Sequence, residues 1–164
     1  MDFTFDEDQE ELRRTVRSFL ERESPPAYVR AMQDDDRGYT DAVWDRIVGL
    51  GWPALLVPEA NHGLGLGLVD MVVVMEEMGR VPFPGPYFSS AVSATLAARR
   101  LGLDQQLASL ASGATRGTVA LEEAGAGDPV TRVRTRAVRK CASTARTCPQ
   151  PAIRCMACMP RSKC

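Results

Sequence analysis

The sequence predicts a mainly α-helical domain, followed by the first strand or strands of a β-domain and then a disordered tail. Three observations predict this order. Apolar residues recur at helical spacing in successive segments up to residue 112, with capping residues before them and glycine or proline after them. The first strand-like pattern begins only at Thr115. Beyond Val138 no apolar periodicity remains, and a segment with so little to bury cannot offset its ordering entropy.

The first helix is predicted over residues 6–23. Its apolar side chains are spaced to share one stripe: Leu12, Val16, Phe19 and Leu20. Asp6 and Gln9 have the spacing of a capping box, and the acidic first turn suits the helix dipole. Two prolines after Ser24 end this helix.

Two shorter helices follow, over residues 27–33 and 41–50. The acidic run 34–36 between them is expected to be a solvated loop, because three adjacent carboxylates do not converge on one ion without further ligands. Thr40 caps the third helix, and Gly51 suits the position after its C-terminus. The buried face of the third helix is expected to consist of Trp44, Ile47 and Val48.

Residues 51–80 organise the domain, since they combine an apolar run, a glycine-rich turn and a helix. The turn contains Gly63, Gly65 and Gly67. Their spacing does not fit the dinucleotide-binding pattern G-x-G-x-x-G, so we interpret the turn as structural. The helix over residues 68–78, closed by Gly79, is apolar almost all round and is expected to be central.

The next segments alternate between connectors and helices. Three prolines make residues 81–86 a stiff, irregular connector. Ser89 or Ser90 then caps a fifth helix, and Asp104 caps a sixth that ends near residue 112.

These patterns predict three parts. Residues 1–114 form the helical domain, and residues 115–138, with a first strand over 117–121, begin a β-domain. Residues 139–164 form the disordered, basic, cysteine-rich tail.

Charge and cysteine content change abruptly along the chain. Residues 1–130 contain 11 Arg and 21 acidic residues, whereas residues 131–164 contain 7 Arg, 2 Lys and no acid. All the cysteines lie in the second part: Cys141, Cys148, Cys155, Cys158 and Cys164. An out-of-frame translation of a GC-rich gene would produce this composition, so we expect a frameshift or misjoined end near residues 138–141.

Other classes of site find little support. Cys155-x-x-Cys158 is half of a zinc signature without a second close pair, and the tail has no aromatic residue for stacking on nucleic acid bases. His62 is the single histidine, so no His-based triad exists in these residues. The adjacent Glu76 and Glu77 diverge on a helix and are interpreted as structural. No signal peptide or membrane span of about 18 apolar residues is expected, and a cytoplasmic location is the default.

Five motifs, taken in order, resemble those of one enzyme family. They are Phe5 to Gln9 with Val16-Arg17-x-Phe19; Trp44 to Trp52 with Val57-Pro58-Glu59; Gly63-Leu64-Gly65-Leu66; Val73 to Arg80; and Leu110 to Gly113 followed by Val119 to Glu123. With these motifs, about the first 137 residues resemble the N-terminal part of the FAD-dependent acyl-CoA dehydrogenases. The resemblance implies a helical domain leading into a middle β-domain.

The resemblance also implies α,β-desaturation of an acyl-CoA thioester, with FAD as hydride acceptor. It assigns the catalytic base to a C-terminal domain beyond the matching part, so no catalytic residue is named. The implied cofactor contacts are Leu121, Glu122 and Asp128, and the implied substrate contacts are Tyr87, Phe88 and Ser90. For Phe88, the residues themselves favour packing in the core over a substrate contact. Carboxylates at Glu122 and Asp128 depart from the hydroxyls that are usual in the family.

We therefore expect a truncated acyl-CoA dehydrogenase that is inactive alone and belongs to a homo- or hetero-oligomer. One alternative is a non-catalytic helical subunit that pairs with a full-length homologue. A second alternative is a metal-binding module in the cysteine-rich tail, and no nucleic-acid partner is expected.

Overall fold

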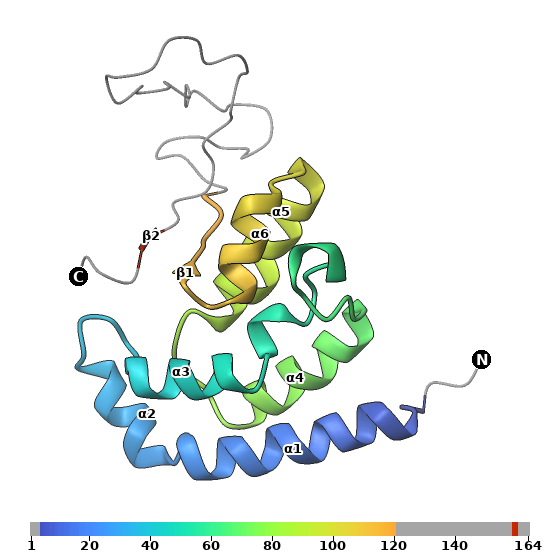
Figure 1. Ribbon diagram of the computed structural model, residues 1–164. Coiled ribbons are helices and arrows are strands. Elements are labelled where there is room, and N and C mark those ends of the chain that lie inside the picture. Colours follow the sequence, from blue (N-terminus) through green and yellow to red (C-terminus); the bar gives the residue numbers. More distant parts are fainter. Residues whose placement is uncertain (1–3, 121–158, 161–164) are drawn as a thin grey trace, which may run out of the picture.

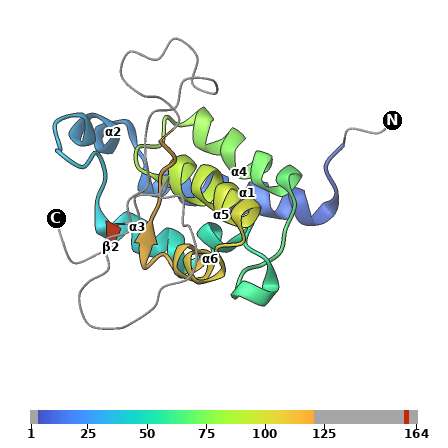
Figure 2. The same ribbon diagram turned by 90° about the horizontal axis from the view of Figure 1, so that it is seen from above.

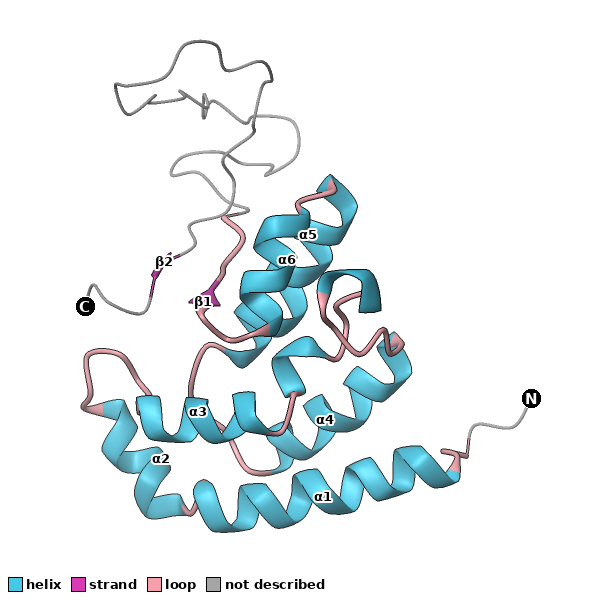
Figure 3. Cartoon of the chain, in the orientation of Figure 1, coloured by secondary structure: helices cyan, strands magenta, loops and turns pink. Residues whose placement is uncertain are grey.

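The computed structural model describes residues 4–120 and 159–160, and the prediction of a mainly α-helical chain is confirmed (Figure 3). The α-helices are α1 (Glu7–Glu23), α2 (Pro26–Gln33), α3 (Asp41–Gly49), α4 (Leu68–Arg80), α5 (Thr95–Leu101) and α6 (Asp104–Ala111). Short 3₁₀ turns span Trp52–Ala54 and Glu59–Asn61, and a π-helix, η3 (Phe88–Ala94), leads directly into α5. The strands are β1 (Thr115–Arg116) and β2 (Met159–Pro160).

Helix α1 runs along one side of the molecule and packs beside α4 (Figure 1). Its first turn and α2 lie at opposite ends of the molecule, as Figure 2 also shows. The predicted capping box is present, because the Gln9 amide donates to the Asp6 carboxylate at 2.8 Å and the Asp6 amide donates to the Gln9 side chain at 3.2 Å. Gln9 also donates to Asp70 at 3.1 Å, and Asp70 accepts from the Gly67 amide at 2.8 Å. Gln9 therefore connects the starts of α1 and α4.

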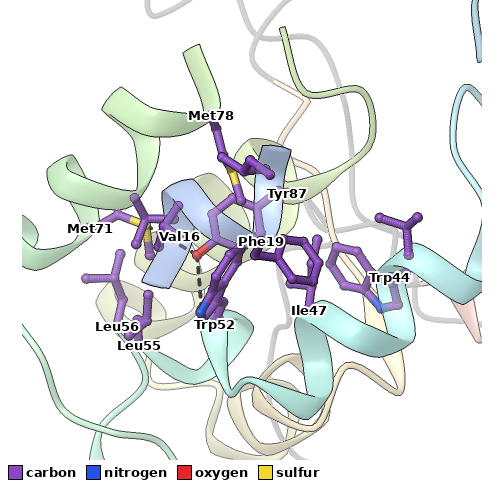
Figure 4. Close-up of a cluster of buried hydrophobic side chains, with 14 residues drawn as sticks. Val16, Phe19, Trp44, Ile47, Trp52, Leu55, Leu56, Met71, Met78 and Tyr87 are labelled. Carbon is purple, nitrogen blue, oxygen red and sulfur yellow. Dashed lines mark hydrogen bonds between the residues drawn. The ribbon is translucent and has the colours of Figure 1, made fainter. Parts of the chain in front are cut away.

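The main core lies between α1, α3, α4 and the run after α3 (Figure 4). Phe19 and Trp52 meet edge to face with ring centroids 4.9 Å apart. The Trp44 indole donates to the Gly113 carbonyl at 3.3 Å, which ties α3 to the end of α6. A second cluster joins the 3₁₀ turn at Ala54 to α5 and α6.

The glycine-rich turn is structural, as predicted. A side chain on Gly63 would place its Cβ 2.0 Å from the Val57 carbonyl oxygen, so the backbone approach there requires glycine. Gly65 has a φ of 65°, and His62 adopts a left-handed φ of 63°.

Helix α4 differs from the prediction in two respects. It continues through Gly79 to Arg80, because its amide donors still find partners and a proline comes only at residue 82. It is also less enclosed than its apolar composition suggests, since Met71, Val73 and Val74 are buried but Leu68, Val69 and Val72 are more than half exposed. Hydrophobicity alone does not say which face has a partner.

The later elements also begin differently. Ser89 and Ser90 lie inside a helix rather than capping it, because the Ser90 amide already donates to the Pro86 carbonyl at 2.9 Å. Asp104 is the first residue of α6 and accepts a hydrogen bond from Asn61 at 3.1 Å instead of capping. The strand predicted over residues 117–121 is not formed over Gly117–Ala120; the strand β1 lies just before it, at Thr115–Arg116, and pairs antiparallel with β2, whereas Leu121 lies outside the described residues.

Of the tail for which the sequence predicts disorder, the structure describes only β2. Within the described residues, no helix is long and apolar enough to cross a bilayer.

Candidate functional site

An open groove of about 450 Å³ lies between α4, the proline-rich connector and the start of η3. Its lining is apolar: Met75, Met78, Gly79, Pro82, Phe83, Gly85, Tyr87 and Phe88. Gly79 is one of the lining residues, and a Cβ there would meet nothing within 4 Å, so this position has room for a side chain. Methionine side chains on the α4 side give the lining a soft, adaptable surface. The groove suits an apolar ligand.

Tyr87 forms the base of the groove from a buried position, with 2% of its surface exposed. Its hydroxyl points into the core, where it donates to the Trp52 carbonyl at 3.1 Å and lies 3.7 Å from the Met71 sulfur (Figure 4). Burial raises the pKa of Tyr87 well above its ordinary value, because the anion would lose its hydration. Tyr87 therefore offers its ring to a ligand and holds its proton at all ordinary pH values.

Phe88 stands at the rim of the groove and is 58% exposed. The favoured expectation, that Phe88 packs in the core, is wrong. The helical segment begins at Tyr87, which takes the inward position, so the next side chain points outward. A phenylalanine this exposed is available to cover a ligand in the groove.

Ser90 lies behind the groove instead of lining it. It is 1% exposed, and its hydroxyl oxygen accepts a hydrogen bond from the Gly117 amide at 3.1 Å. Of the three predicted substrate contacts, the structure therefore brings Tyr87 and Phe88 together and points Ser90 toward the chain that follows β1.

The predicted cofactor contacts Leu121, Glu122 and Asp128 lie outside the described residues, as do all the cysteines. In the part of the chain that the structure describes, no group of three or more His, Cys, Asp or Glu side chains is arranged to hold a metal ion.

Glu77 is a buried carboxylate with a structural role, as the sequence predicted. It is 2% exposed and accepts from Nε and Nη2 of Arg17, at 3.0 and 2.6 Å, and from Nε of Arg80 at 2.9 Å. These hydrogen bonds, chiefly those from Arg17, hold the pKa of Glu77 below its usual range. An ionised carboxylate so fully engaged is unsuited to take a proton from a substrate. Its neighbour Glu76 is exposed and pairs with Arg13 at 2.8 Å.

Sequence reasoning missed most of the groove. Met75, Met78 and Phe83 were assigned to the core or to a connector, and Gly79 was taken for a helix stop. One signal was present, because a glycine inside a helix lowers its stability and so indicates a packing or functional reason for its place there.

The comparisons with known proteins agree on one family. The family model described as acyl-CoA dehydrogenase, N-terminal domain, matches residues 6–118. The chain is 35% identical over 119 residues to acyl-CoA dehydrogenase IpdE2 of Mycobacterium tuberculosis, covering 71% of this chain and 37% of that protein. It is 30% identical over 147 residues to mitochondrial isovaleryl-CoA dehydrogenase of Bos taurus, covering 82% and 33%. The chain thus spans about a third of the length of the curated relatives it matches.

Solved structures give the same fold. The ChsE4–ChsE5 complex from Mycobacterium tuberculosis matches with a TM-score of 0.69 and 28% identity, over 77% of this chain and 36% of that one. A Tcur3481–Tcur3483 steroid ACAD variant matches with a TM-score of 0.68 and 33% identity, over 75% of this chain and 35% of that one.

Proposed function

Since the chain belongs to the acyl-CoA dehydrogenase family, we propose that its helical domain forms one wall of the site where an acyl-CoA thioester is desaturated between Cα and Cβ. The observation that carries this proposal is the apolar groove beside α4. Its volume of about 450 Å³ is within the range of pockets that hold small ligands. Each methylene of an acyl group buried there would gain about 0.8 kcal/mol.

In this proposal the groove residues bind and exclude water, and they do no proton chemistry. Tyr87 offers a ring fixed by its bond to Trp52, and Phe88 covers the acyl group from the rim. Met75 and Met78 adapt to the width of the acyl group. Excluding water from the reacting carbons strengthens every electrostatic interaction made with them.

The proposal includes FAD, which when bound accepts the hydride from Cβ. The residues proposed to contact it, Leu121, Glu122 and Asp128, lie outside the described residues, so no step is derived through the flavin. One described feature fits such a site, because the hydrogen bond from Gly117 to Ser90 brings the chain that leads to Leu121 against the groove helix.

The groove is tested by titrating the chain with octanoyl-CoA and following tryptophan fluorescence or heat. Phe88→Asp places a charge at the rim and is expected to weaken binding at least about tenfold, since it removes apolar cover worth more than 1.4 kcal/mol. Leu101→Asp is the matched control, because Leu101 is 48% exposed and lies outside the groove. Equal losses in the two variants, or none in either, would count against the groove as the acyl site.

We also propose that a polypeptide of these 164 residues has no dehydrogenase activity alone. The described carboxylates and phenols at or beside the groove are already engaged, as Glu77 and Tyr87 show, and none is free to serve as the base. Reduction of an artificial electron acceptor by the purified polypeptide with any acyl-CoA would contradict this.

A second candidate function is that of a helical subunit that pairs with another acyl-CoA dehydrogenase chain. An exposed apolar patch favours it: Leu64, Leu66, Leu68, Val69 and Val72 are 39 to 57% exposed within nine residues of sequence. Two of the structural neighbours are named with two different components each, ChsE4–ChsE5 and Tcur3481–Tcur3483. Co-purification with a full-length homologue tests this, and Val72→Glu is expected to abolish it while Leu101→Glu does not.

The location proposed with this function is the cytoplasm. The absence of cysteine from residues 1–140 fits a reducing compartment.

A further inference from the structure

Ser90 forms hydrogen bonds through its amide, its carbonyl and its hydroxyl, and those of the carbonyl and the hydroxyl differ from the bonds of an ordinary α-helix. Its amide donates to the Pro86 carbonyl at 2.9 Å. Its carbonyl accepts from the Thr95 hydroxyl at 3.1 Å and also from the Thr95 amide, in the five-residue spacing of a π-helix. Its hydroxyl oxygen accepts from the Gly117 amide at 3.1 Å.

The buried side chains at the start of this helical segment contact two different parts of the fold. Tyr87 and Ser90 are both buried, at 2% and 1% exposure, yet they contact different neighbours. Tyr87 is bonded to Trp52 on the core side, and Ser90 is bonded to Gly117 at the start of the chain that continues past β1. Two segments of the fold therefore meet on one short helix, and π-helical turns of this kind occur often at functional sites.

A purely space-filling role does not account for Ser90. The buried positions Ala91 and Ala94 of the same helix are alanine, and alanine has the better helix propensity. What alanine would lack is an acceptor for the Gly117 amide, which is itself buried.

We propose that Ser90 is a positioning residue: its hydroxyl couples the groove helix to the segment Gly117–Ala120, so that filling the groove moves the chain that leads to the predicted flavin contacts. This rests on the proposed function for its biological meaning. The coupling itself does not depend on that function, because a displacement of η3 on its Phe88 side would reach Gly117 through the single hydrogen bond from the Gly117 amide to Ser90.

The test fills the groove from within the chain. Gly79→Leu places a side chain in the groove, where a Cβ meets nothing within 4 Å. The amide resonances of Phe88 and Gly117, and their hydrogen-exchange rates, are followed by nuclear magnetic resonance in ¹⁵N-labelled full-length chain. Gly49→Leu is the matched control, since Gly49 also has open space at its Cβ but lies on α3, outside the groove.

Gly79→Leu is expected to shift the Gly117 amide in the wild-type background and to leave it unchanged when Ser90→Ala is also present. Ser90→Ala alone should speed exchange at Gly117 by about tenfold, the factor that an ordinary hydrogen bond is worth. Ser90→Thr keeps the oxygen and should keep the coupling, and Ser90→Cys, whose sulfur is a weak acceptor, takes the place of Ser90→Ala if the latter fails to fold. The proposal is overturned if Gly79→Leu shifts Phe88 while Gly117 stays still, or if Gly49→Leu shifts Gly117 equally.

An octanoyl-CoA titration of the same labelled chain tests the proposed acyl site separately from the proposed coupling through Ser90. If octanoyl-CoA leaves every groove amide unchanged, the proposed acyl site is wrong, and the Gly79→Leu result still decides whether Ser90 couples the two segments.

Discussion

Replacing Glu77 by glutamine is expected to destabilise the domain by about 2–3 kcal/mol. Removing one partner of a fully buried ion pair costs about 3–5 kcal/mol. Glu77 itself is 2% exposed, but the Arg17 and Arg80 side chains are 48% and 41% exposed. Water can therefore rehydrate both guanidinium groups, which lowers the cost to the range given. Glutamine keeps the shape and one acceptor oxygen, so the loss measures charge rather than packing.

The assay is urea unfolding followed by tryptophan fluorescence, with Glu76→Gln as the matched control on the same helix. Glu76 is 58% exposed and pairs with Arg13, so its loss should cost less than about 1 kcal/mol. At a slope of about 1.5 kcal/mol per molar urea, the Glu77→Gln midpoint falls by about 1.3–2 M with the slope unchanged.

The contribution of Glu77 to the free energy of unfolding should change with pH in a defined direction. The folded-state pKa of Glu77 lies below its ordinary value of 4.5, so its ionised form stabilises the fold fully above that pH. This stabilisation is lost as the pH falls through the folded-state pKa. The gap between wild type and Glu77→Gln should therefore narrow below about pH 4.5. Equal effects of the two glutamine variants at pH 7, or a gap that widens in acid, would refute the reasoning.

One further prediction compares Gly63 with Gly79, and another concerns Tyr87. Gly63→Ala should destabilise by at least about 3 kcal/mol, because its Cβ would collide with backbone. Gly79→Ala, with open space at its Cβ, should stabilise α4 by up to about 0.5 kcal/mol. Thermal unfolding of Gly63→Ala and Gly79→Ala measures both effects. Similar losses of stability in the two variants would contradict the prediction. Tyr87→Phe should cost about 1–1.5 kcal/mol at pH 7 through the lost bond to Trp52. Because burial raises the Tyr87 pKa, wild-type stability is lost as the pH rises past the ordinary value of 10.0, and Tyr87→Phe should lose less; urea titrations at pH 8 and 10.5 measure the difference.

Local signals predicted most of the helices correctly. The Asp6–Gln9 capping box and the Thr40 cap each involve residues three apart, so sequence alone contains both partners. Gly102 and Gly113 end their helices with a φ of 65°, as expected for glycine stops. What the sequence did not predict depends on distant partners. Ser90 does not cap, because Pro86 and Gly117 engage it.

The candidate site was also predicted only as far as local motifs allow, and the rest of it depends on distant partners. A resemblance between motifs placed Tyr87 and Phe88 near a substrate, and the structure places both at the groove. Nothing in the local pattern distinguishes which apolar side chains of α4 face the core, the groove or solvent. Met71 is 2% exposed and Val72 is 55% exposed, although they are adjacent and equally apolar. Only the packing of α1 and the connector decides this.

The two candidate functions can be separated on helix α4 alone. These four residues share one face of α4: Leu68 and Val72 are exposed in its N-terminal half, and Met75 and Gly79 line the groove in its C-terminal half. Because Glu77 fixes α4 against α1, its loss would disturb both halves and could not discriminate between them. Changes confined to one half can. If Val72→Glu abolishes pairing with a homologue and leaves octanoyl-CoA binding intact, the N-terminal half serves a partner and the groove serves a substrate. If one change removes both properties, the whole face acts as a single surface, and the groove is then a contact for the partner chain rather than a site for an acyl group.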